Sequence, residues 1–298
     1  MATLVPETPA ALARLAEAAA ALEGDAAGAL DDLAVVRALQ LHRDVGAALS
    51  RRASAIGAAA AAAAPPPVAA ASAAATRPVP GGKAGLGEQT VVDAVRALRR
   101  GELILVTDDE DRENEGDLIM ASELATAERM AFMVRHTSGV VCVSMPGARI
   151  DALELPPMVG RNEDPKGTAF TVSVDAKAGT TTGISAADRA ETLRQLADPA
   201  RSAADFTRPG HIFPLRAREG GVIVREGHTE ATLDLLLLAG MAPCGALSEV
   251  VSADGLEMAR MPELRRFAAE HGLALTTIAD LVAYRAAHGM ADAIRPID

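Results

Sequence analysis

The chain has 298 residues and a formal net charge of −11 at pH 7, and 49% of its residues are hydrophobic although only 2% are aromatic. This length allows two domains of about 150 residues each or one larger α/β domain. Acidic and basic residues balance in residues 1–87, so the whole negative charge falls on residues 88–298. That part is therefore not expected to bind nucleic acid or an acidic membrane, because phosphate contacts need a basic face.

The first part of the chain predicts a helical extension followed by a linker. Leucine and valine recur at helical spacing in residues 10–23 and 30–52, which predicts a short helical hairpin within residues 1–56. This hairpin packs on the main domain or on itself, or else serves as an oligomerisation or partner-docking element. Residues 57–87 form a low-complexity run of alanine, proline and glycine that is typical of a linker.

A folded domain is predicted over residues 88–290, with a tail over residues 291–298. Helices are predicted from hydrophobic spacing and capping residues: from Thr90 and Pro262 onward, and over residues 126–136, 185–196, 229–239 and 277–288. Strands are predicted from apolar or alternating runs: residues 102–107, 140–144, 168–174, 222–224, 245–251 and 274–277. Residues 206–218, rich in proline, glycine and arginine, are predicted to be irregular. The mixed order of elements favours an α+β or layered α/β domain over a barrel.

The sequence predicts a cytoplasmic protein. Its two cysteines, Cys142 and Cys244, form neither a metal-ligand spacing nor a disulfide framework, and a reducing compartment is the default. No apolar run of about 18 residues predicts a membrane span. The first residues lack the basic region and apolar core of a secretion signal, and their early acidic residues disfavour a transit peptide.

The most informative stretch runs from Asp108 to Asp117, where seven of ten side chains are carboxylates. It directly follows the predicted strand 102–107, so it belongs to the folded domain. Crowded carboxylates raise one another's pKa unless a cation lies among them, and Mg²⁺ prefers oxygen ligands. The alternative is a solvent-facing loop with Arg112 as an internal counter-ion, and the run by itself does not decide between the two. It lacks the glycine and glutamate positions of a calcium-binding loop.

A second stretch, from Arg225 to Ala231, leads into an apolar helix. Free N–H groups at a helix start and the planar cation of Arg225 suit a phosphate, and Gly227 allows close approach of the backbone. His228 is a candidate metal ligand or acid/base group, or else a hydrogen-bonded, partly buried histidine. Further candidates are His211, in a loop with Pro and Gly residues, and Glu249, an acid within a predicted strand. The alternatives are that His211 is a polar residue of a structural loop and that Glu249 faces solvent on an edge strand. Cys142 is by default an inert core residue.

Together these stretches resemble 3,4-dihydroxy-2-butanone 4-phosphate synthase, a riboflavin-pathway family, from about residue 90 to 285. The matching blocks are residues 108–117, 135–139, 167–172, 181–189, 208–215, 227–231 and 280–285. The resemblance implies that family's layered α/β sandwich and conversion of D-ribulose 5-phosphate to 3,4-dihydroxy-2-butanone 4-phosphate and formate. It also implies Mg²⁺ as cofactor, with Mn²⁺ as an alternative ion, and a homodimer with sites near the subunit interface. The implied reaction proceeds through a metal-stabilised enediolate, dehydration, skeletal rearrangement and loss of a one-carbon unit.

The resemblance also implies a role for individual residues. Glu113 and His228 correspond to the metal ligands, and His211 and Glu249 to the residues needed for catalysis. The positions that correspond to substrate contacts are Arg112, Glu113, Asp117, Arg225, Glu226, Gly227, His228 and Thr229. Among these, Arg225, Gly227 and Thr229 correspond to positions near the phosphate. Glu115 and Cys142 correspond to neighbours of the pocket.

The sequence departs from the family pattern in three places. Lys166 stands where many relatives have histidine, in a loop that borders the substrate. No zinc-type cysteine cluster follows the matching region, so the GTP cyclohydrolase II activity fused to many relatives is not expected. Residues 1–88 lie outside the resemblance. The main alternative function is a catalytically silent metal-binding or phosphate-binding regulatory descendant of the fold.

Overall fold

The structure is a computed structural model that describes residues 85–297. The predicted helical extension, and all but the end of the predicted linker, lie outside the described residues. None of the helices within residues 85–297 is long and apolar enough to cross a membrane.

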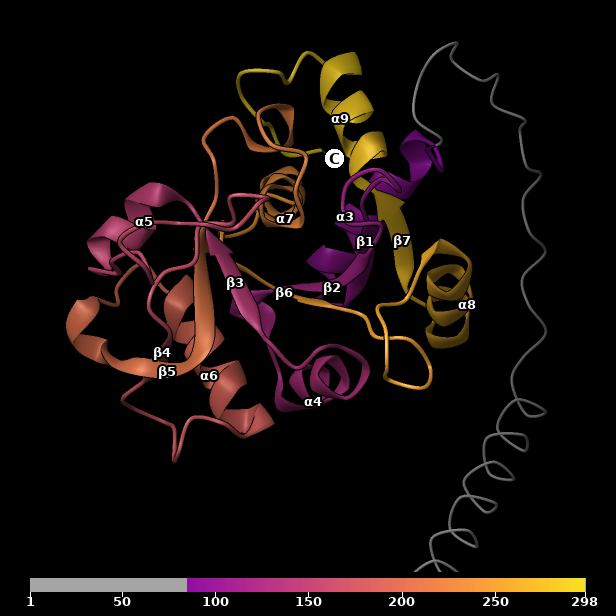
Figure 1. Cartoon of the computed structure of the whole chain (residues 1–298). Coiled ribbons are helices and arrows are strands. Elements are labelled where there is room, and N and C mark those ends of the chain that lie inside the picture. The colour runs from indigo at the N-terminus through magenta and orange to yellow at the C-terminus, as the bar shows by residue number, and fades with distance from the viewer. Residues whose placement is uncertain (1–84, 298) are drawn as a thin grey trace, which may run out of the picture. The chain divides into compact units, whose positions relative to one another are not determined.

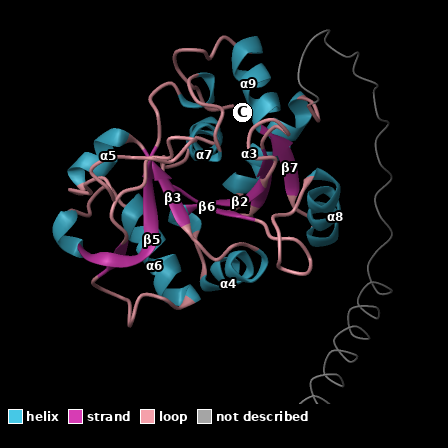
Figure 2. Ribbon diagram, viewed as in Figure 1, coloured by secondary structure: helices cyan, strands magenta, loops and turns pink. Residues whose placement is uncertain are grey.

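A seven-stranded mixed sheet forms the middle layer (Figures 1 and 2), with the strand order β4-β5-β3-β6-β2-β1-β7. Its strands are β1 (Ile104–Thr107), β2 (Gly116–Ala121), β3 (Cys142–Met145), β4 (Val174–Ala176), β5 (Phe206–Arg216), β6 (Gly245–Glu249) and β7 (Ala274–Thr277). The pairs β1/β7 and β3/β5 are parallel and the other neighbours are antiparallel. The predicted α+β, layered character is confirmed.

Helices cover both faces of the sheet. They are α3 (Glu88–Arg99), α4 (Ala127–His136), α5 (Gly147–Ala152), α6 (Ala186–Ala197), α7 (His228–Leu238), α8 (Met261–His271) and α9 (Ile278–Ala287), with 3₁₀ turns η1 (Ser122–Leu124), η2 (Ala203–Asp205) and η3 (Gly221–Ile223). One apolar core lies between the sheet and α4, α6 and α8. The other lies between the sheet and α3, α7 and α9, so α7 and α9 are opposite α4 and α6 in Figure 1.

Alternation along β2 shows how the sequence builds this sandwich. Leu118 and Met120 enter the first core, whereas Ile119 and Ala121 enter the second, as the two-residue period of a strand requires. Asp117 is two residues before Ile119 in β2, so its side chain points to the α7 face.

The predicted cap of α6 is also present, because the Ser185 side chain accepts a hydrogen bond from the backbone N–H of Asp188.

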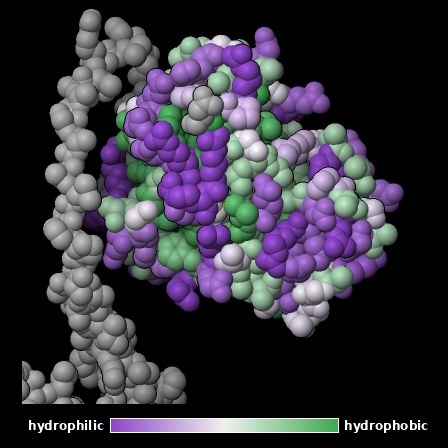
Figure 3. Space-filling model, turned by 180° about the vertical axis from the view of Figure 1, so that it is seen from behind, coloured by the Kyte–Doolittle hydropathy of each residue, from purple (hydrophilic) through white to green (hydrophobic). Residues whose placement is uncertain are grey.

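Some large hydrophobic side chains remain on the surface. In the view of Figure 3, green patches lie between purple, hydrophilic ones. Val140 is 44% exposed and Ile184 is 50% exposed, and both lie next to segments that carry candidate site residues.

Three predicted elements were wrong or incomplete. Residues 206–218 contain the 11-residue strand β5. Pro214 is tolerated in this strand because its carbonyl accepts a hydrogen bond from the N–H of Thr171, and no N–H of Pro214 is needed on that side. Residues 222–224 are not a strand but lie at η3, after a turn with positive φ at Gly220 and Gly221. Of residues 168–174, Phe170 and Thr171 make only isolated bridges, and regular pairing begins at Val174.

Candidate functional site

The acidic run is the loop of the β1–β2 hairpin, and Asp108 organises it. The Asp108 carboxylate accepts hydrogen bonds from the backbone N–H groups of Glu115, at 2.8 Å, and Glu113, at 3.0 Å. It also accepts a hydrogen bond from Arg112 at 2.9 Å. Arg112 in turn contacts the Glu113 carboxylate, so it is an internal counter-ion, as the alternative reading expected. The loop is nevertheless folded inward, because the Asp108 side chain is almost completely buried.

This loop meets the start of α7. His228, the first residue of α7, is 6% exposed and its Nδ1 lies 3.6 Å from Glu113 Oε2 and 3.8 Å from Asp117 Oδ1. Asp108, Glu113 and His228 each offer one ligand atom, and these atoms lie within 4.8 Å of one another. Within residues 85–297, His228 Nε2 and Asp117 Oδ1 are buried without a hydrogen-bond partner. Buried polar atoms rarely lack partners, so this donor set fits a divalent cation.

The electrostatics of the cluster are those of a negatively charged pocket. The His228 imidazole and the Arg112 guanidinium hold the pKa of Glu113 to about 2, against the opposing effect of burial. Burial by itself would lower the pKa of His228, but Asp117, Glu113 and Asp108 together raise it to about 9. Burial raises the pKa of Asp117 to about 7. The raised pKa of His228 reflects the carboxylates around it, and the raised pKa of Asp117 reflects burial beside Glu249, Glu113 and Glu115. A bound cation would offset this excess of negative charge.

Glu249 lies beside this cluster in the sheet. It pairs directly with Asp117 across β6 and β2, so both side chains are on the α7 face. Ser138 donates a 2.7 Å hydrogen bond to Glu249 Oε2. Cys142 pairs with Leu247, one row further into the sheet, and burial raises the pKa of its thiol well above the usual range. Cys142 is therefore a buried thiol in the core on the α7 face of the sheet.

His211 is on the same face of the sheet but further away. Phe213 pairs with Cys142, so His211, two residues earlier, continues the row that holds Glu249 and Asp117. It lies two strands from Glu249 and three from Asp117. At about 4.8 Å per strand these separations are roughly 10 and 14 Å. Within one chain, His211 is thus not part of the cation cluster.

Arg225 anchors the segment before α7. It donates hydrogen bonds to Glu230 Oε2 at 2.6 Å, to Thr168 Oγ1 at 3.2 Å and to the Lys166 carbonyl at 3.3 Å. Lys166 Nζ donates to the Arg112 carbonyl at 2.7 Å. The loop that contains Lys166 and Thr168 therefore touches both the acidic loop and the start of α7.

Two guanidinium groups converge on Gly227, the N-cap of α7. A Cβ at this position would overlap an Arg225 nitrogen and would lie 3.0 Å from an Arg112 nitrogen and 2.9 Å from Glu230 Oε2. No side chain of the described residues caps this helix start. Thr229, the second residue of α7, is buried. Two cations and free N–H groups around a bare backbone form a suitable anion site.

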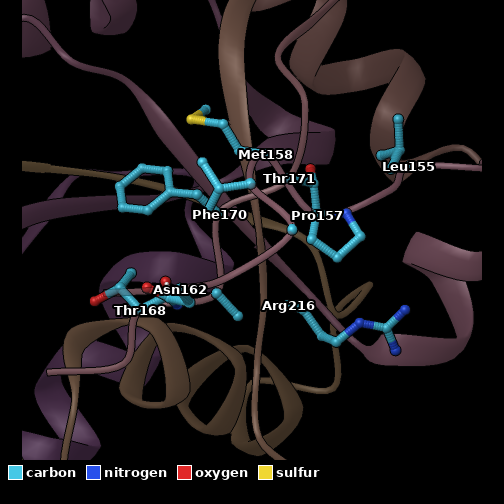
Figure 4. Close-up of a pocket in the computed structure, with 11 residues that line it drawn as sticks. Leu155, Pro157, Met158, Asn162, Thr168, Phe170, Thr171 and Arg216 are labelled. Atoms are coloured by element: carbon cyan, nitrogen blue, oxygen red, sulfur yellow. Dashed lines mark hydrogen bonds between the residues drawn. The ribbon is translucent and has the colours of Figure 1, made fainter. Parts of the chain in front are cut away.

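An apolar pocket of about 360 Å³ adjoins this site at Thr168 (Figure 4). Met158 and Phe170 line one part of it and Arg216 another. None of the carboxylates of the acidic loop lines it, so the pocket is a neighbour of the charged cluster and not the cluster itself.

A model of the 3,4-dihydroxy-2-butanone 4-phosphate synthase family matches residues 92–284, more than half of the chain. The chain belongs to this family. It is 57% identical over 194 residues to the 3,4-dihydroxy-2-butanone 4-phosphate synthase of Agrobacterium fabrum, which covers 65% of this chain and 91% of that protein. A solved structure of a 3,4-dihydroxy-2-butanone 4-phosphate synthase in complex with two magnesium ions has 47% sequence identity and a TM-score of 0.64, and the match covers 67% of this chain and 98% of that one.

Other relatives of this synthase family are longer. The chain is 58% identical over 201 residues to the monofunctional riboflavin biosynthesis protein RIBA 2, chloroplastic, of Arabidopsis thaliana, which covers 67% of this chain but 42% of that protein. It likewise spans 46% of the RibBA protein of Salinispora arenicola. The chain therefore spans less than half of these riboflavin biosynthesis proteins.

The structure brings most of the predicted site residues into two adjoining groups. In one group Glu113, His228 and Asp117 lie together, with Glu249 beside them, and in the other Arg112, Arg225, Gly227 and Thr229 lie around the start of α7. Glu115 lies at the rim, 3.8 Å from Arg260, and Glu226 is exposed. The sequence reading missed the structural roles of Asp108 and Glu230. Both lie inside the stretches it singled out, but only the fold shows which way their carboxylates point.

Proposed function

We propose that this chain converts D-ribulose 5-phosphate to 3,4-dihydroxy-2-butanone 4-phosphate and formate in riboflavin biosynthesis. The observation that carries this proposal is the meeting of the acidic loop with the start of α7, where three potential cation ligands adjoin two guanidinium groups. Membership of the synthase family and the relatives named for this reaction product support the choice of reaction.

In this proposal Glu113 and His228 hold a divalent cation, Mg²⁺ or Mn²⁺, with Asp108 beside them. The donor set fits such an ion because it combines two carboxylates with an imidazole whose buried Nε2 lacks a protein partner. A cation bound there supplies Lewis-acid stabilisation of negative charge on the sugar. Arg112, together with His228, keeps Glu113 ionised, and Asp108 holds Arg112 in place by pairing with the same guanidinium.

The substrate phosphate would bind at the start of α7. Arg225 offers a planar cationic fork that Glu230 already orients. Gly227 leaves room for close approach, and the N–H groups of the first helical turn, including that of Thr229, point toward the site. Arg112 and Glu226 flank this position. Phosphate anchoring of this kind contributes mainly to binding.

Proton transfers at the carbon chain are assigned to Glu249 and His211. Removal of a proton beside a carbonyl, loss of water and release of a one-carbon unit each need a positioned acid or base. Glu249 shares a row with Asp117 and is held by Ser138. Asp117, Glu115 and Cys142 complete the wall of the pocket around the sugar.

We further propose a homodimer with its sites near the subunit interface. The distance of His211 from the cation cluster within one chain supports this, because a second chain could bring its own His211 closer. The exposed side chains of Val140 and Ile184 would then be covered by the partner. A mass measurement in solution tests this, and a monomer that is fully active would contradict it.

We assign the reaction to the cytoplasm, although two relatives are named chloroplastic.

The proposed activity is tested by formate release from D-ribulose 5-phosphate in the presence of Mg²⁺, with and without a chelator. Formate release that depends on the cation is expected. Absence of formate with well-folded, Mg²⁺-loaded protein would favour the alternative, a silent binding protein. That alternative has no support from the sequence, since every residue assigned by the resemblance is present.

A further inference from the structure

The His211 side chain pairs with a buried carboxylate that lies outside both the acidic loop and the start of α7. Asp175, in the edge strand β4, is 7% exposed. Its Oδ1 accepts a 2.8 Å hydrogen bond from the backbone N–H of His211, and its Oδ2 lies 2.7 Å from His211 Nδ1. One carboxylate thus fixes both the main chain and the ring of the same histidine, whose side chain is 39% exposed.

The backbone around this pair is shaped to bring the two residues together. The pairing of β4 with β5 shifts register between Val174 and Asp175, which turns the Asp175 side chain toward His211. A Cβ at Gly210 would overlap the backbone of Val174, and a Cβ at Gly183 would overlap Asp175 Oδ2 and lie 2.8 Å from His211 Nδ1. Gly183 also has a φ of +90°. Two glycines therefore permit the close approach that the pair needs.

A buried cation lies near Asp175. Arg189 of α6 is buried, and burial lowers its pKa while Asp175 opposes this effect. The neighbouring carboxylate, Asp188, does not touch His211. It accepts hydrogen bonds from Thr181 and from the N–H of Gly183 and so shapes the loop next to the pair. Asp188 is therefore a matched control for Asp175.

We propose that Asp175 is a positioning residue that holds His211 in one tautomer, with the proton on Nδ1 and the lone pair on Nε2. An ionised carboxylate only accepts hydrogen bonds, so the ring nitrogen facing it must carry the proton. His211 Nε2 is then free to take a proton from the substrate and return it. The catalytic role of His211 in this inference rests on the proposed function, whereas the tautomer of the His211 ring does not.

The first test is the tautomer in the full, unaltered chain. Nitrogen NMR of protein labelled at histidine, recorded at a pH where the His211 ring is neutral and assigned with His211→Gln, should show the proton of His211 on Nδ1. The Asp175→Asn variant should lose this preference, because an amide can donate to Nδ1, whereas Asp188→Asn should keep it. A proton on Nε2 in the unaltered chain would overturn the inference, whether or not any variant folds.

The second test is kinetic. Asp175→Asn should lower kcat for formate release between about 10-fold and 10⁴-fold, as misplaced tautomers do in other histidine enzymes, while KM stays within about threefold. Asp188→Asn should leave kcat within about threefold of the original. A normal kcat with Asp175→Asn would refute the positioning role. If His211→Gln is itself fully active, the proposed catalytic role of His211 fails, and the tautomer result separates that failure from the structural claim.

Discussion

Glu113 Oε2 lies 3.6 Å from His228 Nδ1, although the two residues are far apart in the sequence. Glu113 belongs to the β1–β2 loop and His228 begins α7, and they meet because α7 packs on the face of the sheet where this loop emerges. This separation is close enough for both side chains to share one cation. Most of what we expect of the protein depends on that contact.

Replacement of Glu113 by glutamine should abolish most of the proposed activity. The change keeps the shape of the side chain but removes the charge that faces His228 and the cation, so we expect formate release to fall at least about 100-fold. Circular dichroism should show an intact fold. Glu110→Gln is the matched control, because Glu110 lies in the same run but is exposed. Near-normal formate release by Glu113→Gln would remove Glu113 from the site.

Mg²⁺ should stabilise the folded protein. An ion present at about 100 times its Kd adds about 2.7 kcal/mol to the free energy of unfolding. For a domain of this size that corresponds to a rise in Tm of about 5–10 °C. Calorimetry with Mg²⁺ and with a chelator measures the rise, which His228→Ala should eliminate. A rise that persists in His228→Ala would place the ion elsewhere.

Glu230 should matter for substrate affinity through its contact with Arg225. Its buried carboxylate holds Arg225 at 2.6 Å, so Glu230→Gln should loosen the guanidinium. We expect KM to rise about 10-fold with kcat nearly unchanged, since the lost interaction is mainly uniform binding. Steady-state kinetics should show Arg225→Ala acting in the same direction and more strongly.

Asp234 provides the control for Glu230. It lies one turn further along α7 and pairs with Arg285 at 2.6 Å instead of with Arg225. Asp234→Asn should lower stability, because it leaves a buried cation without its partner, but it should not change KM. If Glu230→Gln and Asp234→Asn raise KM equally, the effect comes from general loosening of α7 and not from Arg225.

The sequence was sufficient for much of the site because its chemistry is concentrated in short stretches. The acidic run, the segment before α7 and the strand with Glu249 were each recognisable from residue type and from the resemblance. The fold class followed from the same blocks, and family membership confirms it. What the sequence could not provide was direction: Asp108 and Glu230 are ordinary members of acidic stretches until the fold turns them inward.

The errors have a similar physical origin. Residues 206–218 looked irregular because proline and glycine usually interrupt strands. In β5, however, Pro214 faces a side of the strand where only its carbonyl is needed. Asp175 carried no signal at all in the sequence, since its contact with His211 depends on a register shift between two strands. Such long-range pairing is not readable from local pattern.

His136, which lies in a cluster of aromatic rings, should make the free energy of unfolding depend on pH. His136 contacts the rings of Phe132, Phe267 and His271, and burial, with His271 and Arg135, lowers its pKa below the ordinary value of 6.5. The unfolded chain then binds the proton more readily, so stability from this group is present above pH 6.5 and is lost as pH falls below it. Between pH 7.5 and 5.5, Tm should therefore fall less for His136→Gln than for the original chain. Equal slopes would show that His136 does not contribute.

Residues 88–298 should carry the proposed activity without the segment before them. Every candidate site residue lies in this part, and so do all the residues of both apolar cores that the structure describes. We expect the shortened chain to release formate with kcat and KM within about threefold of those of the full chain. If activity is kept but the mass in solution changes, residues 1–87 act in oligomerisation or docking. If activity is lost while circular dichroism shows a folded protein, the extension contributes to the site, and the boundary near Glu88 is wrong.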